Sequence, residues 1–220
     1  VNKGASFNSL GYRGREIRQQ KEGQTRIWVV GDSFTFGPGV RDSETYSAVL
    51  ETELLNSEGG AVEVINAGVP GRWVDEYYLD LKRRGLALDP DIVLVGVYIR
   101  NDLDGKDARG HVWAEVDAEG LPVVVEFPEI RIENGREVRA IRKSRWKLPI
   151  IRDSHVAQLL YDAGKVVDQG TRGRSVKNAH HYQDDIGPEA ELAIDKVERL
   201  LVAMDDLAQA RGIRLVVMLF

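Results

Sequence analysis

The sequence IWVVGDSF, residues 27–34, joins a short apolar run to a turn of glycine, aspartate and serine. The run Ile27–Val30 is β-branched and lacks polar alternation, which favours a parallel strand covered on both faces. Ser33 then lies where the chain turns from a strand toward a helix, and open α/β folds carry their sites at that carboxyl edge. Many turn serines only cap a helix, so Ser33 alone indicates little about function.

Three other apolar runs share this character, and they are Val62–Ile65, Ile92–Ile99 and Ile213–Phe220. Helical patterns separate them, near 44–57, 73–85 and 188–211. Pro188 suits the first turn of the last helix, and Gly212 is a suitable stop after it. The alternation predicts a doubly wound α/β fold with a mostly parallel sheet and helices on both faces.

This alternation stops between residues 104 and 187. Four short strands are predicted there, near 112–116, 123–127, 130–133 and 138–141, with turns at Glu119-Gly120 and Asn134-Gly135. A helix near 150–168 and a polar loop over 169–185 are predicted to follow. We interpret 104–187 as an inserted small β-rich segment with a helix, within one domain that spans 1–220. Binding specificity often resides in such segments.

Composition excludes several classes of function. The chain has 220 residues, a formal net charge of -5 and no cysteine, which excludes disulfides, thiolate zinc sites and cysteine nucleophiles. It has no basic stripe for nucleic acid, and its longest apolar run is too short to span a membrane. Gly37-Pro38-Gly39 lacks the residues of a phosphate or dinucleotide loop, so we expect no cofactor.

Two further motifs follow the next two predicted strands. Asn66–Gly71 reads NAGVPG, and its glycines let backbone approach a ligand closely. Asn101 and Asp102 follow the run Ile92–Ile99, and an asparagine amide can donate to an oxyanion. A plain βα turn and a helix N-cap are the ordinary alternatives. The motifs converge on one edge of the sheet because all follow the carboxyl ends of parallel strands.

In order and residue type, these motifs resemble the first three blocks of the SGNH/GDSL hydrolase family. Gly31–Phe34 is similar to the nucleophile block, Asn66–Gly71 to the glycine block, and Asn101-Asp102 to the asparagine block. The resemblance covers about residues 26–103 and the final helix–strand unit, and it implies a flavodoxin-like sheet. Asn8–Arg13 also resembles a lead-in found in bacterial, often envelope-associated members, which slightly favours the cell envelope or secretion over the cytoplasm.

By this resemblance the protein is a serine-dependent ester hydrolase that forms an acyl-enzyme on Ser33. The oxyanion hole would comprise the Ser33 N–H, the Gly71 N–H and the Asn101 side chain. Gly68 competes with Gly71 for the second position, and Gly71 fits the family spacing better. No metal is implied, and the expected partner is a small-molecule or glycan ester.

The family's fourth block, an Asp and a His three residues apart, is absent from the sequence. The chain starts with Val1 and ends in an apolar strand-like run, so we expect a domain truncated at the C-terminus that is nearly inactive alone. The available histidines are His111, His155, His180 and His181. His180 and His181, with Asp184 and Asp185, could supply a base or a metal site, although solvated loop histidines are commoner.

Three functions remain open from the sequence. They are an ester hydrolase, a polysaccharide O-acetyltransferase on the same fold, and a non-catalytic binding domain that has lost the base. A basic cluster could contact an acidic polysaccharide or be a solvated face, and it comprises Arg139, Arg142, Lys143, Arg145 and Lys147. Trp113 and Trp146 could stack on sugar rings or pack in the structure.

Overall fold

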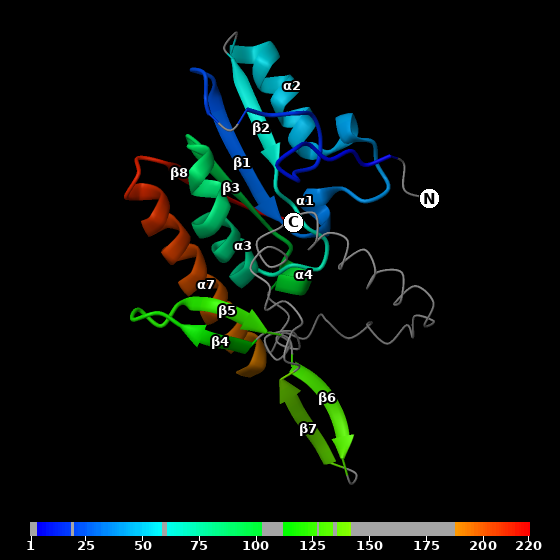
Figure 1. Cartoon of the computed structure of the whole chain (residues 1–220), viewed down its shortest axis with the longest axis vertical. Coiled ribbons are helices and arrows are strands. Elements are labelled where there is room, and N and C mark those ends of the chain that lie inside the picture. The colour runs from blue at the N-terminus through cyan, green and yellow to red at the C-terminus, as the bar shows by residue number, and fades with distance from the viewer. Residues whose placement is uncertain are drawn as a thin grey trace.

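The computed structural model describes residues 4–18, 20–58, 61–102, 112–126, 128–133, 136–141 and 188–220. Four strands form one sheet in the order β2-β1-β3-β8, and every pair in it is parallel (Figure 1). The strands are β1 (Thr25–Gly31), β2 (Val62–Asn66), β3 (Ile92–Val97) and β8 (Arg214–Leu219). The predicted parallel α/β fold is confirmed.

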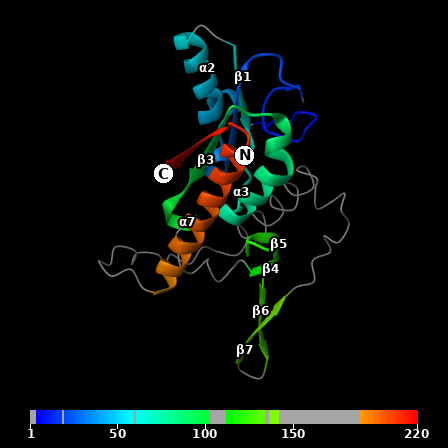
Figure 2. The same cartoon turned by 90° about the vertical axis from the view of Figure 1, so that its left-hand side faces the viewer.

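Helices lie on both faces of this sheet, as predicted (Figures 1 and 2). On one face α2 (Tyr46–Glu58) packs Leu50 and Leu54 against Val29. On the other face α3 (Val74–Asp80) and α7 (Pro188–Gln209) cover a core that includes Trp28 and Val95. Among the described helices, none combines the length and hydropathy needed to cross a membrane.

Two elements differ from their predicted form. The strand predicted to reach Ile99 ends at Val97, because the Asp102 carboxyl accepts the Tyr98 N–H at 2.8 Å and starts the turn α4 (Ile99–Asp102). The helix predicted near 73–85 is not uniform. It continues from α3 as a π-helix over Leu81–Gly85 and a 3₁₀ turn over Leu86–Leu88.

Two antiparallel hairpins follow α4 in the chain. They are β4 (Val112–Val116) with β5 (Pro122–Glu126), and β6 (Pro128–Glu133) with β7 (Arg136–Ile141), so the four predicted strands are confirmed. The Trp113 indole donates to Asp75 at 3.1 Å, which ties the first hairpin to α3. The predicted turn at 134–135, the helix near 150–168 and the loop 169–185 lie outside the described residues.

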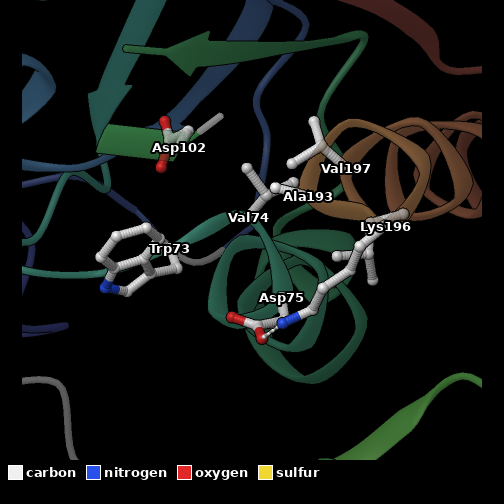
Figure 3. Close-up of a pocket in the computed structure, with 8 residues that line it drawn as sticks. Trp73, Val74, Asp75, Asp102, Ala193, Lys196 and Val197 are labelled. Carbon is white, nitrogen blue, oxygen red and sulfur yellow. Dashed lines mark hydrogen bonds and ion pairs between the residues drawn. The ribbon is translucent and has the colours of Figure 1, made fainter. Parts of the chain in front are cut away.

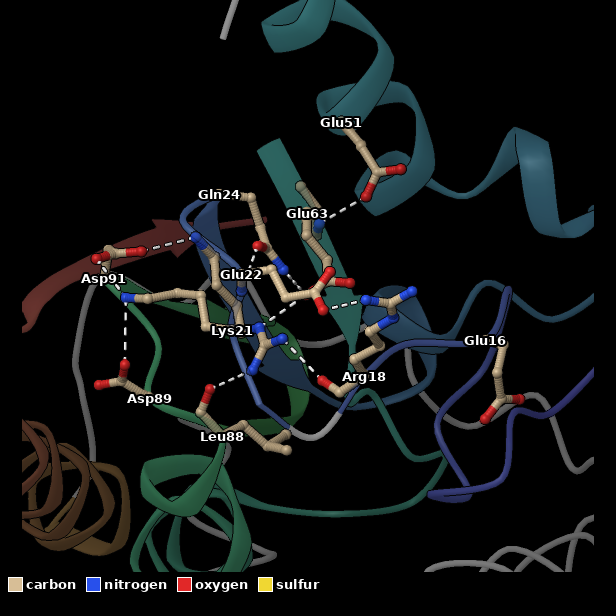
Figure 4. Close-up of polar contacts among 12 residues, drawn as sticks. Glu16, Arg18, Lys21, Glu22, Gln24, Glu51, Glu63, Leu88, Asp89 and Asp91 are labelled. Carbon is tan, nitrogen blue, oxygen red and sulfur yellow. Dashed lines mark hydrogen bonds and ion pairs between the residues drawn. The ribbon is translucent and has the colours of Figure 1, made fainter. Parts of the chain in front are cut away.

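A buried arginine joins the strands at the amino end of the sheet. Arg26 is fully buried and pairs with Glu63 at 2.7 Å. Its guanidinium also donates to the carbonyls of Leu88 and Arg18, and these acceptors are labelled in Figure 4. Asp91 accepts the Arg26 N–H at 2.8 Å. This network fixes the end of the sheet opposite the motifs, because those lie at the carboxyl ends of the strands.

Candidate active site

Ser33 is the first residue of the one-turn helix α1 (Ser33–Phe36), which follows β1 directly. Asp32 caps this helix, and its carboxyl accepts the Phe34 N–H at 2.8 Å. Gly37 ends it in the left-handed conformation at φ +77°. Ser33 is half-buried, and its hydroxyl has no hydrogen-bond partner among the residues that the structure describes. The hydroxyl is therefore available to a ligand at the carboxyl edge of the sheet.

The helix α1 packs closely against Gly96 of β3 and against Gly68 of the loop that follows β2. A Cβ on Gly96 would lie 2.8 Å from Thr35 Oγ1, and a Cβ on Gly68 would lie 2.7 Å from the Thr35 carbonyl carbon. Thr35 is fully buried, and its hydroxyl bonds with that of Tyr46 at 2.9 Å. Because these glycines have no side chain, α1 can pack directly against their backbone. A glycine in a turn motif does not by itself indicate such close packing.

Asn66 connects α1 to the glycine loop that follows β2. Its Nδ2 donates to the Thr35 carbonyl at 2.9 Å and to Ser47 Oγ at 3.0 Å. Its Oδ1 accepts the Gly68 N–H at 3.0 Å. The sequence motif includes Asn66, but the pattern gives it no role, because its partners lie 19 and 31 residues away in the chain.

The geometry of the glycine loop favours Gly71 over Gly68 as a donor. The Gly68 N–H already bonds to Asn66. Gly71 is exposed at φ +79°, and within the described part of the chain its N–H has no partner. The next residue, Arg72, is buried and pairs with Asp80 at 3.3 Å, while its carbonyl accepts the Tyr77 hydroxyl at 3.2 Å. These contacts hold the loop next to Gly71 in place.

Asn101 lies in α4, at the carboxyl end of β3. Its side chain is outside what the structure describes, so its predicted reach toward a shared oxyanion stays a prediction. The backbone places all three motifs at one edge, since β1 lies between β2 and β3. The Val69 N–H bonds to the Gly31 carbonyl at 3.0 Å, and the rings of Phe34 and Tyr98 stack at 4.1 Å.

Asp102 is a buried carboxyl in the same region. It accepts the Tyr98 N–H at 2.8 Å, and the Tyr77 hydroxyl lies 3.4 Å from its Oδ1. Burial raises the pKa of Asp102 to about 7, with further contributions from the negative charges of Asp32 and Asp75. Asp102 therefore changes its protonation state near neutral pH, and the sequence alone did not indicate this.

A small cavity lies between α3, α4 and α7 (Figure 3). It has a volume of about 20 Å³ and is lined in part by Trp73, Asp102 and Lys196. Lys196 pairs with the buried carboxylate of Asp75 at 2.8 Å. A space of this size holds one water molecule, so it is too small to bind an acyl group.

The described residues contain no identified base for Ser33. His111, His155, His180 and His181, with Asp184 and Asp185, lie outside the described ranges, as do Trp146 and the basic residues 142–147. Within the described ranges, no group of three or more His, Asp or Glu residues is arranged to hold a metal ion. What the described geometry offers is a serine hydroxyl and the Gly71 N–H at one edge of the sheet, both without a partner among the described residues.

No protein-family model matches the chain, and no curated protein matches it. Among solved structures, it is similar to AlinE4, an SGNH-hydrolase family esterase, at 32% identity over 40% of this chain, with a TM-score of 0.32. The match spans 49%, about half, of the AlinE4 chain.

Longer alignments have lower identity. The acetyl xylan esterase AlAXEase is 18% identical over 87% of this chain and 76% of its own, with a TM-score of 0.35. A catalytic mutant of Axe2, an acetylxylan esterase from Geobacillus stearothermophilus, is 14% identical over 89% of this chain and 77% of its own, with a TM-score of 0.34. TM-scores this low do not establish a shared fold or function. The α/β class is established by the sheet itself.

Proposed function

We propose that the protein is a serine-dependent ester hydrolase with Ser33 as its nucleophile. One observation carries this proposal. Ser33 is the first residue of a helix at the carboxyl edge of a parallel sheet, and the exposed Gly71 follows the neighbouring strand. Neither the Ser33 hydroxyl nor the Gly71 N–H has a hydrogen-bond partner among the described residues. Nucleophile and backbone donor on adjacent loops are the arrangement that acyl transfer needs.

In this mechanism Ser33 Oγ attacks the acyl carbon of the ester, and the tetrahedral intermediate then breaks the ester C–O bond, which releases the alcohol and leaves an acyl-enzyme. The N–H groups of Ser33 and Gly71, with the Asn101 amide, stabilise the oxyanion of the tetrahedral intermediate. A base takes the Ser33 proton, gives it to the leaving alcohol, and later activates the water that releases the acid, a contribution of about 10²–10⁴-fold. We propose that residues 104–187 form the insertion that selects the small-molecule or glycan ester.

The first prediction concerns Ser33→Ala. We expect this substitution to reduce hydrolysis of p-nitrophenyl acetate by at least about 10³-fold, because no acyl-enzyme can form without the hydroxyl. The rate of p-nitrophenolate release should be measured for the 220 residues and for the longest chain that the gene encodes. Product analysis with an added glycan acceptor then separates hydrolysis from acetyl transfer.

Ser57→Ala is the matched control, because Ser57 is exposed near the end of α2 and makes only a long bond to the Leu54 carbonyl. This variant should keep the full rate. If both forms of the chain lack Ser33-dependent turnover with every ester and acetyl donor, the catalytic proposal is wrong and a binding domain is favoured. If the 220 residues alone turn over ester, alanine substitution of His180 and His181 tests each as the base.

A further inference from the structure

The segment before β1 folds into a compact loop. The Oδ1 of Asn8 accepts the N–H groups of Leu10 and Tyr12 at 3.1 and 3.0 Å, and its Nδ2 donates to the Arg15 carbonyl at 3.1 Å. The backbone of Arg13 forms a bridge to Asn66, the residue that also holds Thr35. The loop is therefore attached to the carboxyl edge of the sheet beside α1.

From this loop the Arg13 side chain reaches the end of α1. Its Nη1 donates to the carbonyls of Phe36 and Gly37 at 2.7 and 2.5 Å. Its Nη2 donates to the Val40 carbonyl at 2.7 Å. The guanidinium also lies over the Phe36 ring, 4.8 Å from its centroid. Its side chain is only 2% exposed, so solvent does not compete for these contacts.

Asp42 fixes the orientation of this guanidinium. Its Oδ1 accepts from Arg13 Nε at 2.7 Å, while its Oδ2 accepts from the Ser6 N–H at 3.0 Å and from Ser6 Oγ at 2.6 Å. Burial would raise the pKa of Asp42, but the hydrogen bonds from Ser6 and Arg13 offset this and lower it overall. Arg13 is thus oriented by a charged acceptor, which limits its side chain to one arrangement.

The helix α1 needs such external contacts. It has one turn, and its own bonds run from Phe36 N to the Asp32 carbonyl and from Gly37 N to the Ser33 carbonyl. A single turn is not stable in isolation, and the last carbonyls of a helix have no intrahelical partner. Arg13 supplies donors for two of these carbonyls, so the position of α1 depends on it.

We propose that Arg13 is a positioning residue for Ser33, because it fixes the far end of the one-turn helix that presents the serine hydroxyl. The inference rests on the proposed function. A displacement of about 1 Å at a reacting group can lower a rate by about 10²-fold. Arg13 touches no reacting atom, so its effect should fall on turnover and leave substrate binding almost unchanged.

The test compares Arg13→Met and Arg13→Lys in the form of the chain that shows Ser33-dependent turnover. Arg13→Met should lower kcat by about 10²-fold and change KM by less than about threefold. Arg13→Lys should recover part of kcat, because an ammonium retains the charge but cannot contact Asp42 and three carbonyls in the same planar geometry.

Two neighbours provide matched controls. Tyr12 is equally buried in the same loop, but its ring belongs to the main core cluster that contains Trp28, so Tyr12→Phe should lower stability and keep kcat. The Arg15 side chain is 55% exposed and pairs with Glu51, so Arg15→Met should keep both the stability and kcat. If Arg13→Met lowers kcat no more than Tyr12→Phe does, the positioning role is wrong.

Hydrogen exchange gives a readout that does not need activity. The amides of Phe36 and Gly37 should exchange faster in Arg13→Met and Arg13→Lys than in Tyr12→Phe. Equal exchange in these variants overturns the inference. If Ser33-dependent turnover is absent in the unsubstituted chain, the proposed function fails, and the exchange data alone still decide whether Arg13 holds α1.

Discussion

Gly68→Ala is expected to remove activity and to lower the free energy of unfolding by about 3 kcal/mol or more. The new Cβ would lie 2.7 Å from the Thr35 carbonyl carbon and closer still to the Phe36 nitrogen. These are backbone atoms, which cannot rotate away as a flexible side chain can. The helix α1 would have to move away from the glycine loop that follows β2, and Ser33 would move with it.

Gly39→Ala is the control for the backbone part of this effect. Gly39 has φ +84°, but no atom lies within 4 Å of a Cβ placed there. That variant should lose about 1 kcal/mol from backbone strain and keep its activity. The measurements are urea unfolding and hydrolysis of p-nitrophenyl acetate. A Gly68→Ala protein as stable and active as Gly39→Ala would contradict the close packing of α1.

The pattern of apolar runs was sufficient to predict the sheet. Each run lies next to turn residues and is too short for a helix, and parallel pairing follows from the helices between them. The serine at the end of β1 and the glycine after β2 were predicted for the same reason, since strand ends locate loops. Local sequence patterns are therefore sufficient to predict the fold and the order of the motifs.

Long-range polar contacts could not be predicted in this way. Arg13 and the α1 carbonyls that it binds lie 23 and 24 residues apart, and no periodicity links them. The same is true of Asn66 and the Thr35 carbonyl. The π-helical turn at Leu81–Gly85 also gave no signal, because the amphipathic pattern of an α-helix continues through it. Such features depend on packing that only the folded chain defines.

The candidate site also includes a carboxyl whose ionisation opposes folding. The unfolded chain holds Asp102 near its ordinary pKa of 3.8, whereas burial raises the pKa in the folded state to about 7. Below 3.8 both states are protonated, and stability is unaffected. Between the two values the unfolded state releases its proton first, so the free energy of unfolding falls as pH rises.

The size of this effect follows from the two pKa values. Each pH unit costs up to about 1.4 kcal/mol, so the loss is complete above pH 7 at about 4 kcal/mol. Asp102 is 4% exposed, so solvent screens this cost little. Three neighbouring groups bear on it. Asp32 and Asp75 disfavour its ionised form, and Lys196, which lines the same cavity, is already paired with Asp75.

Asp102→Asn is therefore expected to remove this loss and to raise the stability above pH 7 relative to the unsubstituted chain. The asparagine carbonyl can still accept the Tyr98 N–H, and its amide can donate to the Tyr77 oxygen, so that Tyr77 keeps its bond to the Arg72 carbonyl. Urea unfolding from pH 4 to pH 8 measures the difference, because carboxyls remote from Asp102 contribute equally to both proteins. Asp206→Asn, on the exposed side of α7, should leave the pH dependence unchanged.

The contradicting outcome is a difference in stability between Asp102→Asn and the unsubstituted chain that stays constant from pH 4 to pH 8. Such a result would show that Asp102 is ionised in the folded state without penalty. The prediction of a neutral carboxyl beside Tyr77 would then be wrong.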